Sequence, residues 1–328
     1  MRFGTFIPQG WRFDLVGIEP SSHWEVMNGL AQRADTGPWE SLWVYDHFHT
    51  TPVHSDETTH EAWTLMAAFA ASTSRIRLGQ MCTCMGYRNP AYLAKVAATV
   101  DIVSGGRTEM GIGGGWYEHE WEAYGYGFPP VPERLRMLRE GVDIMQQAWT
   151  TGRATLDGKH YQVDGAIVQP LPLQDGGIPF WIAGGGEKVT LKIAAKYGAY
   201  TNFAGSVEEF DHKSDVLRGH CEALGRDFSE ITRSSNFNTI VGATEAEARE
   251  RLSAVVERLR PHVGDERVAR IEHDYLESPA FGTPEQVAER LAERSEHGLG
   301  YAIHYFPEAA YDLSGVELFE REVIPALS

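Results

Sequence analysis

The sequence predicts a single (β/α)₈ barrel, an α/β fold in which parallel strands alternate with helices. Short β-rich runs alternate with long amphipathic stretches from one end of the chain to the other, which is typical of βα units around a parallel sheet. Eight such runs are present, whereas a doubly wound sheet usually has about five or six strands. No change in composition and no Pro/Ser-rich linker interrupts the pattern, so we expect one domain over residues 1–328.

Each predicted strand is a short apolar run, and most are followed by residues with helical spacing. The eight strands are expected at Arg2–Pro8, Ser41–Phe48, Ile76–Cys84, Thr108–Gly115, Pro179–Ala183, Ala199–Phe203, Ile231–Val241 and Tyr301–Phe306. Five of the helices are expected at His23–Ala34, Glu61–Ala71, Pro90–Ile102, Val131–Trp149 and Glu187–Tyr197. Insertions are expected around residues 151–177, where Asp-Gly between two β-rich arms predicts a hairpin, and around 261–283.

Composition excludes several classes of protein. Hydrophobic residues make up 42% of the chain, which is enough for a large core, and the formal net charge is −17. Such an acidic chain is repelled by phosphate backbones and anionic lipids, so neither nucleic acid nor a membrane surface is an expected partner. The N-terminus lacks the pattern of a signal peptide, and no apolar run reaches 18 residues. Three cysteines in so long a chain suggest reduced thiols in the cytoplasm.

The segment Trp181–Gly198 holds the most informative motif. A predicted strand runs into Gly184, Gly185 and Gly186, and a helix is expected to begin at Glu187. A glycine-rich turn between a strand and a helix exposes N–H groups at the positive end of the helix. This turn therefore predicts a phosphate or anion site, although tight glycine turns are also common in barrels.

A second glycine cluster ends the fourth predicted strand. Gly111, Gly113, Gly114 and Gly115 run into Trp116, but a dinucleotide fingerprint needs glycine at position 116. No acidic residue closes a following strand about 20 residues on, so Rossmann-type binding is disfavoured. The chain also lacks a P-loop and a nucleophile elbow, so the sequence gives no support for nucleotide hydrolysis or serine acyl transfer as its function.

Asp46 and His47 end the second predicted strand, where a barrel places catalytic groups. Imidazole titrates near neutrality and can donate or accept a proton beside a reacting carbon, while a neighbouring carboxylate can fix its tautomer. The alternative is a pair that only makes hydrogen bonds at the strand end.

The histidines His47, His49, His54 and His60 lie near Asp46 and Asp56 in the sequence, yet their spacing matches no compact zinc pattern. We interpret them as loop histidines and expect no metal. Alternation along the last strand puts Ala302, His304 and Phe306 on one face, so His304 is expected in the barrel core.

Taken together, these segments resemble the bacterial luciferase-like monooxygenase superfamily, and within it the actinobacterial oxidoreductases that use the deazaflavin coenzyme F420. The resemblance rests on segments from both halves of the chain, namely MRFGTFIPQGW, WVYDHFH, LGQMCTCMGYRNP, MGIGGGWYEHEW, GKHYQV, IAGGGEKVTLKIAAKY and FGTPEQVAERL. Family members are (β/α)₈ barrels with insertions, commonly homodimers, that bind a flavin or deazaflavin at the top of the barrel.

The resemblance implies a set of site residues. Gly184, Gly185, Gly186 and Glu187 would contact the cofactor phosphate, and Gly113 would lie in the cofactor site. Asp46 would approach the deazaflavin ring, and His47 would serve proton transfer near the reacting carbon. A non-prolyl cis peptide would fall at Met81-Cys82, behind the ring.

Departures from the sugar-phosphate dehydrogenases of that branch limit what the resemblance implies about substrate. Trp116 stands where those enzymes have an acidic residue, and their Trp after the Asp-His pair is absent, so glucose 6-phosphate is a poor expectation. Glu118 or Glu120 could replace the missing acid, or their segment could be a surface loop. Trp116, Tyr117 and Tyr87 are expected to line an aromatic, apolar substrate pocket.

The sequence therefore predicts a cytoplasmic F420-dependent oxidoreductase that transfers hydride from reduced F420 to a small organic substrate. Transfer in the reverse direction is also open. Two alternatives also fit the chain. One is an FMN-dependent monooxygenase of the same superfamily, and the other is a non-catalytic flavin-binding homologue.

Overall fold

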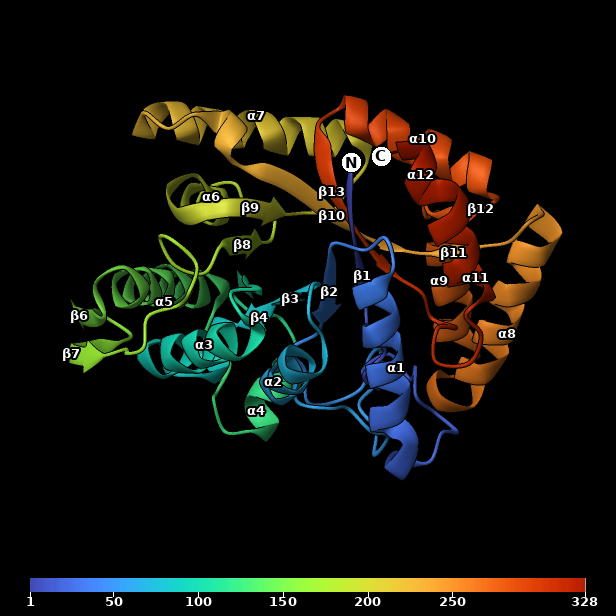
Figure 1. Ribbon diagram of the computed structural model, residues 1–328, viewed down its shortest axis with the longest axis horizontal. Coiled ribbons are helices and arrows are strands. Elements are labelled where there is room, and N and C mark those ends of the chain that lie inside the picture. The colour runs from blue at the N-terminus through green and yellow to red at the C-terminus, as the bar shows by residue number, and fades with distance from the viewer. Residues whose placement is uncertain (328) are drawn as a thin grey trace. The chain divides into compact units, whose positions relative to one another are not determined.

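Parallel strands and the helices that connect them form a (β/α)₈ barrel in the computed structural model, which describes residues 1–327 (Figure 1). The main sheet has the strand order β3-β2-β1-β13-β10-β9-β8-β5-β4, and β3 also pairs with β5. The barrel strands are β1 (Arg2–Phe6), β2 (Ser41–Val44), β3 (Arg77–Gln80) with β4 (Thr83–Cys84), β5 (Thr108–Gly113), β8 (Phe180–Ala183), β9 (Gly198–Asn202), β10 (Thr232–Asn238) and β13 (Leu299–Tyr305). Each falls within or beside one of the eight predicted runs, so the predicted fold class is confirmed.

The described chain divides into two compact units. The terminal unit comprises residues 1–43, 47–60 and 234–328, and the central unit comprises residues 44–46 and 61–233. Asp46 therefore belongs to the central unit, whereas the next residue, His47, belongs to the terminal unit. The expectation of one domain over 1–328 stays a prediction.

In the terminal unit, β1 pairs in parallel with β2 and with β13, with Thr5 opposite both Leu42 and His304. Its other elements are η1 (Pro20–Ser22), α1 (His23–Thr36), β11 (Ile240–Val241), α8 (Glu245–Val263), α9 (Asp265–Leu276), β12 (Phe281–Gly282), α10 (Pro284–Glu296), α11 (Ser314–Leu318), η4 (Phe319–Val323) and α12 (Ile324–Leu327). The two ends of the described chain lie side by side (Figure 1), because the Met1 amino group donates a hydrogen bond to the Leu327 carbonyl oxygen at 2.9 Å.

In the central unit, β5 pairs in parallel with β3 and β8, and β8 pairs with β9. The other elements are α2 (Ala62–Ser72), η2 (Met85–Tyr87), α3 (Pro90–Ser104), α4 (Glu118–Ala123), α5 (Val131–Thr151), β6 (Arg153–Asp157), β7 (Gln162–Ile167), α6 (Thr190–Tyr197), α7 (Val207–Leu224) and η3 (Phe228–Glu230). Local sequence explains where helices begin. Asn89 caps the N-terminus of α3 ahead of Pro90, and Ser206 and Glu209 form a capping box on α7.

Both predicted insertion segments contain secondary structure of their own. The hairpin predicted from Asp-Gly is confirmed, because β6 and β7 pair in an antiparallel ladder. The segment 261–283 holds the last residues of α8, all of α9 and β12. Helix α6 begins at Thr190 and not at Glu187, because residues 187–189 form a turn before it. The glycines of this region are thus separated from the helix N-terminus by one turn.

His304 lies in the core of the terminal unit, as expected. Its ring is fully buried among Phe3, Trp39, Phe237 and Phe319, with centroid distances of 4.4 to 6.3 Å. Nδ1 lies 2.8 Å from the Thr239 hydroxyl, while Nε2 has no hydrogen-bond partner. Burial lowers the pKa of His304 to about 3, so the ring is neutral near pH 7.

Within residues 1–327, no helix combines the length and the apolar character needed to cross a lipid bilayer.

The pKa of His304 predicts a loss of stability in acid. Because the folded protein binds this proton more weakly than the unfolded chain does, stability is complete above pH ~6.5 and falls as the pH drops toward 3, by at most about 1.4 kcal/mol per pH unit. Urea unfolding between pH 7 and pH 4.5 should show a shallower pH slope for His304→Gln than for the wild type. His273→Gln, at an exposed position of α9, is the matched control. Equal slopes for wild type and His304→Gln would contradict this assignment.

Candidate functional site

A buried ion pair organises the carboxyl end of β2 in the central unit. Asp46 is 1% exposed, and Arg88 donates to both of its carboxylate oxygens, from Nη1 at 2.7 Å and from Nη2 at 2.8 Å. The Cys84 backbone N–H donates to the same carboxylate at 2.8 Å, and Arg88 Nη2 also contacts Glu61 at 2.8 Å. Burial alone lowers the pKa of Arg88, but the two carboxylates outweigh it and raise that pKa, so the guanidinium stays charged.

Sequence reasoning did not find Arg88. The sequence suggested that the Asp46 carboxylate fixes the neighbouring imidazole, whereas in the structure both of its oxygens accept hydrogen bonds from partners within the central unit. Asp46 thereby fixes the backbone at Cys84 and the side chain of Arg88. The only sequence signal was a lone arginine after the β4 region, which is not distinctive.

The Met81-Cys82 peptide bond is cis, as the resemblance implied. Two glycines at the end of β5 and just after it leave room for the thiols of Cys82 and Cys84. A Cβ at Gly113 would lie 2.8 Å from Cys82 Sγ, and a Cβ at Gly115 would lie 2.4 Å from Cys84 Sγ. The second glycine cluster therefore has a packing role in the fold.

Neither thiol of this segment is a nucleophile. Burial and the Asp46 charge raise the pKa of the Cys82 thiol to about 12, and the same two causes raise the pKa of Cys84. Both stay protonated at neutral pH. Among residues 1–327, no three His, Cys, Asp or Glu side chains are grouped so that they could hold a metal ion.

A second buried acid lies beside this segment. Glu120 is fully buried and accepts a hydrogen bond of 2.9 Å from the Tyr87 hydroxyl, while Glu118 is exposed at the start of α4. Burial, together with the charge of Glu120 and the hydrogen bond to it, raises the pKa of Tyr87, so its hydroxyl remains a donor. Of the two glutamates named from the sequence, Glu120 is the one held in the interior.

The residues predicted to line a substrate pocket differ in exposure. Tyr87 is 5% exposed, whereas Trp116 is 59% exposed and stacks on Tyr117 with ring centroids 5.2 Å apart. Their place in a substrate site stays a prediction, as do the roles of Glu118, Met81 and Gly113.

The glycine turn after β8 is bordered by a lysine that the sequence did not indicate. Lys213, on α7, donates to the Gly185 carbonyl oxygen at 3.1 Å and lies 3.7 Å from Glu187. A Cβ on Gly185 would lie 2.7 Å from Lys213 Cε, and Gly184 has a φ of +111°. The Glu187 side chain meets His212 at 3.1 Å.

His47 is placed by an aromatic stack within the terminal unit. Its ring lies parallel to Trp11, with centroids 4.2 Å apart and an interplanar angle of 1°. Arg12 lies over both Trp11 and Tyr305, and the Tyr305 hydroxyl donates to the buried Asp14 at 2.9 Å. Burial raises the pKa of Asp14. The stack leaves the imidazole with a fixed plane, which is what directional proton transfer needs.

Another of the histidines in this loop, His60, pairs with a histidine of α1. His60 lies against His23, with Nε2 3.1 Å from His23 Nδ1, and His23 Nε2 lies 2.9 Å from the Ile18 carbonyl oxygen. Burial and the neighbouring His23 lower the pKa of His60. This pair is a structural contact and not a solvated loop pair.

Comparison with known proteins was made once this geometry was clear. A family model described as luciferase-like monooxygenase matches residues 1–301. An F420-dependent glucose-6-phosphate dehydrogenase from Kineococcus radiotolerans is 33% identical over 225 residues, which cover 67% of this chain and 65% of that protein. The match thus spans slightly less than two thirds of that relative.

Two further comparisons cover nearly the whole chain. An FMNH(2)-dependent dimethylsulfone monooxygenase from Pseudomonas putida is 24% identical over 335 residues, covering 94% of this chain and 90% of that protein. The solved structure of monooxygenase RslO1 from Streptomyces bottropensis superposes with a TM-score of 0.80 at 21% identity, covering all of both chains. That likeness establishes the same fold.

The Asp46–Arg88 pair predicts a large effect on stability. Arg88→Gln leaves a buried carboxylate without its cation, so the free energy of unfolding should fall by about 3–5 kcal/mol, as measured by urea denaturation. Asp46→Asn combined with Arg88→Gln should recover part of that loss, because no uncompensated charge remains. Arg136→Gln, which removes an exposed pair with Glu133, should change little. A small effect of Arg88→Gln would mean that Asp46 does not need the pair.

Proposed function

Because this chain belongs to the luciferase-like monooxygenase family, we propose that it is an oxidoreductase that uses coenzyme F420 and acts on a small organic substrate. The observation that carries the proposal is the 33% identity to an F420-dependent dehydrogenase over two thirds of the chain. The direction proposed is reduction of the substrate by reduced F420. A cytoplasmic homodimer is part of the same proposal.

The residues present fit an anionic cofactor at the turn after β8. Gly185 lacks a Cβ, and the space that a Cβ would take is bordered by the flexible end of Lys213, which can move to admit a ligand. Lys213 already lies at hydrogen-bond distance from this turn and offers the positive charge that a phosphate requires. Gly184, Gly186 and Glu187 complete the proposed phosphate side.

Reduced F420, when bound, would supply a hydride from C5 of its deazaflavin ring, which is two-electron chemistry that leaves the cofactor oxidised. The chain's own task is then to bind, orient and move one proton. His47 is proposed to give that proton to the substrate during reduction, because Trp11 fixes the plane of its ring and imidazole nitrogens can donate a proton.

Asp46 is proposed to position the site and not to exchange the proton. Its carboxylate accepts hydrogen bonds from the Cys84 N–H and from the Arg88 guanidinium, so it is already engaged by two donors. The segment from Met81 to Cys84 is thereby held in one conformation for a ring to pack against. Tyr87, Trp116 and Tyr117 are proposed for the substrate side, and their rings favour an apolar molecule.

An FMN-dependent monooxygenase is the second candidate. It is favoured by the dimethylsulfone monooxygenase of Pseudomonas putida, which matches this chain over 94% of its length.

Cofactor titration distinguishes the two candidates. Purified protein titrated with F420 and with FMN, each followed by cofactor fluorescence, should bind F420 more tightly. Gly185→Val should weaken that binding about tenfold or more, because a β-branched side chain blocks approach to the backbone. Gly185→Val with Lys213→Ala removes the collision with the lysine and should remain weak. Equal or tighter FMN binding would favour the monooxygenase.

Replacement of His47 tests proton transfer. His47→Ala should bind F420 nearly normally, while turnover falls by about 10²- to 10⁴-fold, the usual contribution of a positioned general acid. Steady-state kinetics and a thermal melt on the same samples separate catalysis from stability. His54→Ala, at an exposed position of the following loop, is the control. A stable His47→Ala protein with an unaltered rate would remove His47 from the mechanism and favour Glu120.

A further inference from the structure

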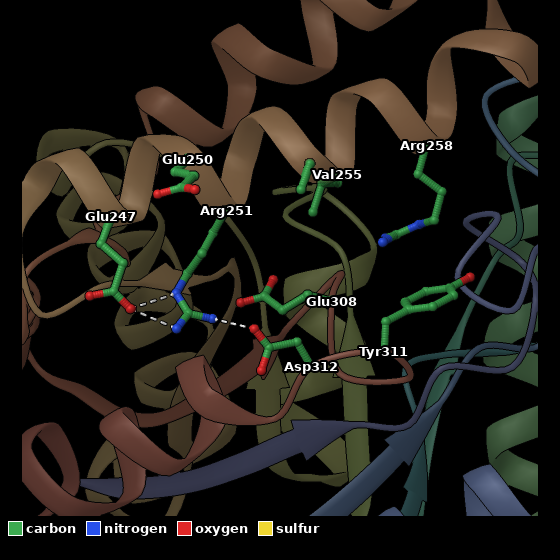
Figure 2. A pocket seen from close by; sticks show the side chains of 9 residues that line it. Glu247, Glu250, Arg251, Val255, Arg258, Glu308, Tyr311 and Asp312 are labelled. Atoms are coloured by element: carbon green, nitrogen blue, oxygen red, sulfur yellow. Dashed lines mark hydrogen bonds and ion pairs between the residues drawn. The ribbon is translucent and has the colours of Figure 1, made fainter.

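A pocket in the terminal unit takes no part in the chemistry proposed above. It lies between α8 and residues 306–312, which follow β13, and has a cavity volume of about 380 Å³ (Figure 2). We call it the α8 pocket. Its main lining residues are Arg251, Val255 and Arg258 from α8, with Glu308, Tyr311 and Asp312 from the opposite segment.

Glu308 is the unusual residue of the α8 pocket. It is only 5% exposed, and neither oxygen of its carboxylate accepts a hydrogen bond from another residue. Figure 2 shows this carboxylate in the space between the two arginines, with no interaction drawn to it. A buried carboxylate that accepts no hydrogen bond from another residue is costly, since it has lost most of its hydration.

Both neighbouring arginines make hydrogen bonds to groups other than Glu308, and Arg258 Nε has no hydrogen-bond partner within the described chain. Arg251 donates to Glu247 at 2.7 Å and to Asp312 at 2.9 Å, as Figure 2 shows. Arg258 donates to the Pro307 carbonyl oxygen at 2.6 Å, and its guanidinium carbon lies 4.0 Å from the Tyr311 ring centroid. Neither guanidinium is hydrogen-bonded to Glu308, so a donor from outside could be accommodated.

The charges that line the α8 pocket indicate whether a ligand there would be a cation or an anion. Four acidic residues line the pocket, Glu247, Glu250, Glu308 and Asp312, against two arginines. An anion is therefore disfavoured and a cation favoured. A bare metal ion lacks ligands, because residues 1–327 contain no group of three His, Cys, Asp or Glu side chains placed to hold one. Ala254 and Val255 add an aliphatic wall along α8.

We propose that the α8 pocket is a binding site for a small aliphatic amine, whose ammonium group donates hydrogen bonds to Glu308 and whose hydrocarbon chain lies along Ala254 and Val255. An ammonium group is compact, has three donors and matches the two free oxygens of a carboxylate. This site is independent of F420, and its test does not involve turnover.

The same carboxylate makes binding depend on pH. Burial raises the pKa of Glu308 to about 7 and Asp312 adds to the rise, while the residue's own backbone N–H and the charges of Arg251 and Arg258 oppose it. The other groups that face it from α8 and from the opposite segment are Glu247, Glu250 and Tyr311. Because an ammonium group needs the ionised carboxylate, affinity should be about tenfold higher at pH 8 than at pH 6, and binding near pH 7 should release protons.

The experiment is isothermal titration calorimetry of the full chain at pH 8 with n-butylamine, n-butanol and butyrate. Saturable binding is expected for butylamine alone. Glu308→Gln should weaken it at least tenfold, and Glu250→Gln, on the exposed rim of the same helix, less than threefold. Repeating the titration at pH 6 should reproduce the loss expected from protonation of Glu308.

A second variant keeps the test valid if Glu308→Gln does not fold. Ala254→Phe places a bulky ring at the pocket from an exposed position of α8, so it should abolish binding in a protein with an unchanged circular dichroism spectrum. Four results would each overturn the proposal: no butylamine binding to the wild type, equal binding of butanol, tighter binding of butyrate, or butylamine binding that survives both substitutions.

Discussion

The bidentate pairing of Asp46 with Arg88 is the interaction on which the central unit's candidate site depends. A carboxylate with 1% exposure can stay ionised only if its charge is compensated and its oxygens are satisfied, and here Arg88 and the Cys84 N–H do both. The pair joins the end of β2 to the segment that follows the cis peptide at Met81-Cys82. Any ring that packs against this segment meets a surface whose position is set by that buried charge.

Packing around that segment explains why small residues recur in the next strand. Gly113 and Gly115 leave space for the sulfur atoms of Cys82 and Cys84, so part of a motif that looks like a nucleotide fingerprint is required by the protein's own interior. The glycines after β8 differ, because what borders Gly185 is the flexible end of Lys213. Two similar sequence motifs therefore have different physical causes.

The titratable groups His47, His304 and Glu308 differ in what surrounds them. His47 is held by a parallel stack on Trp11, which fixes its plane and suits it to proton transfer. His304 is held in an aromatic core that suppresses its charge, and Glu308 is a buried acid whose oxygens have no donor. Burial acts on both of these groups against the charged form, which lowers the pKa of the base and raises the pKa of the acid.

The sequence by itself determined the barrel, the eight strand positions, the β6–β7 hairpin and the core position of His304, because hydrophobic periodicity and turn residues are local signals. It also placed the cis peptide, through resemblance to a family. The start of α6 was misplaced by three residues, since Glu187 has good helix propensity but lies in a turn. Only the tertiary structure decided which side chains meet: Arg88 with Asp46, Trp11 with His47, and Lys213 with the glycine turn. These partners are separated along the chain by 42, 36 and 28 residues, and no local sequence pattern indicates a contact over such distances.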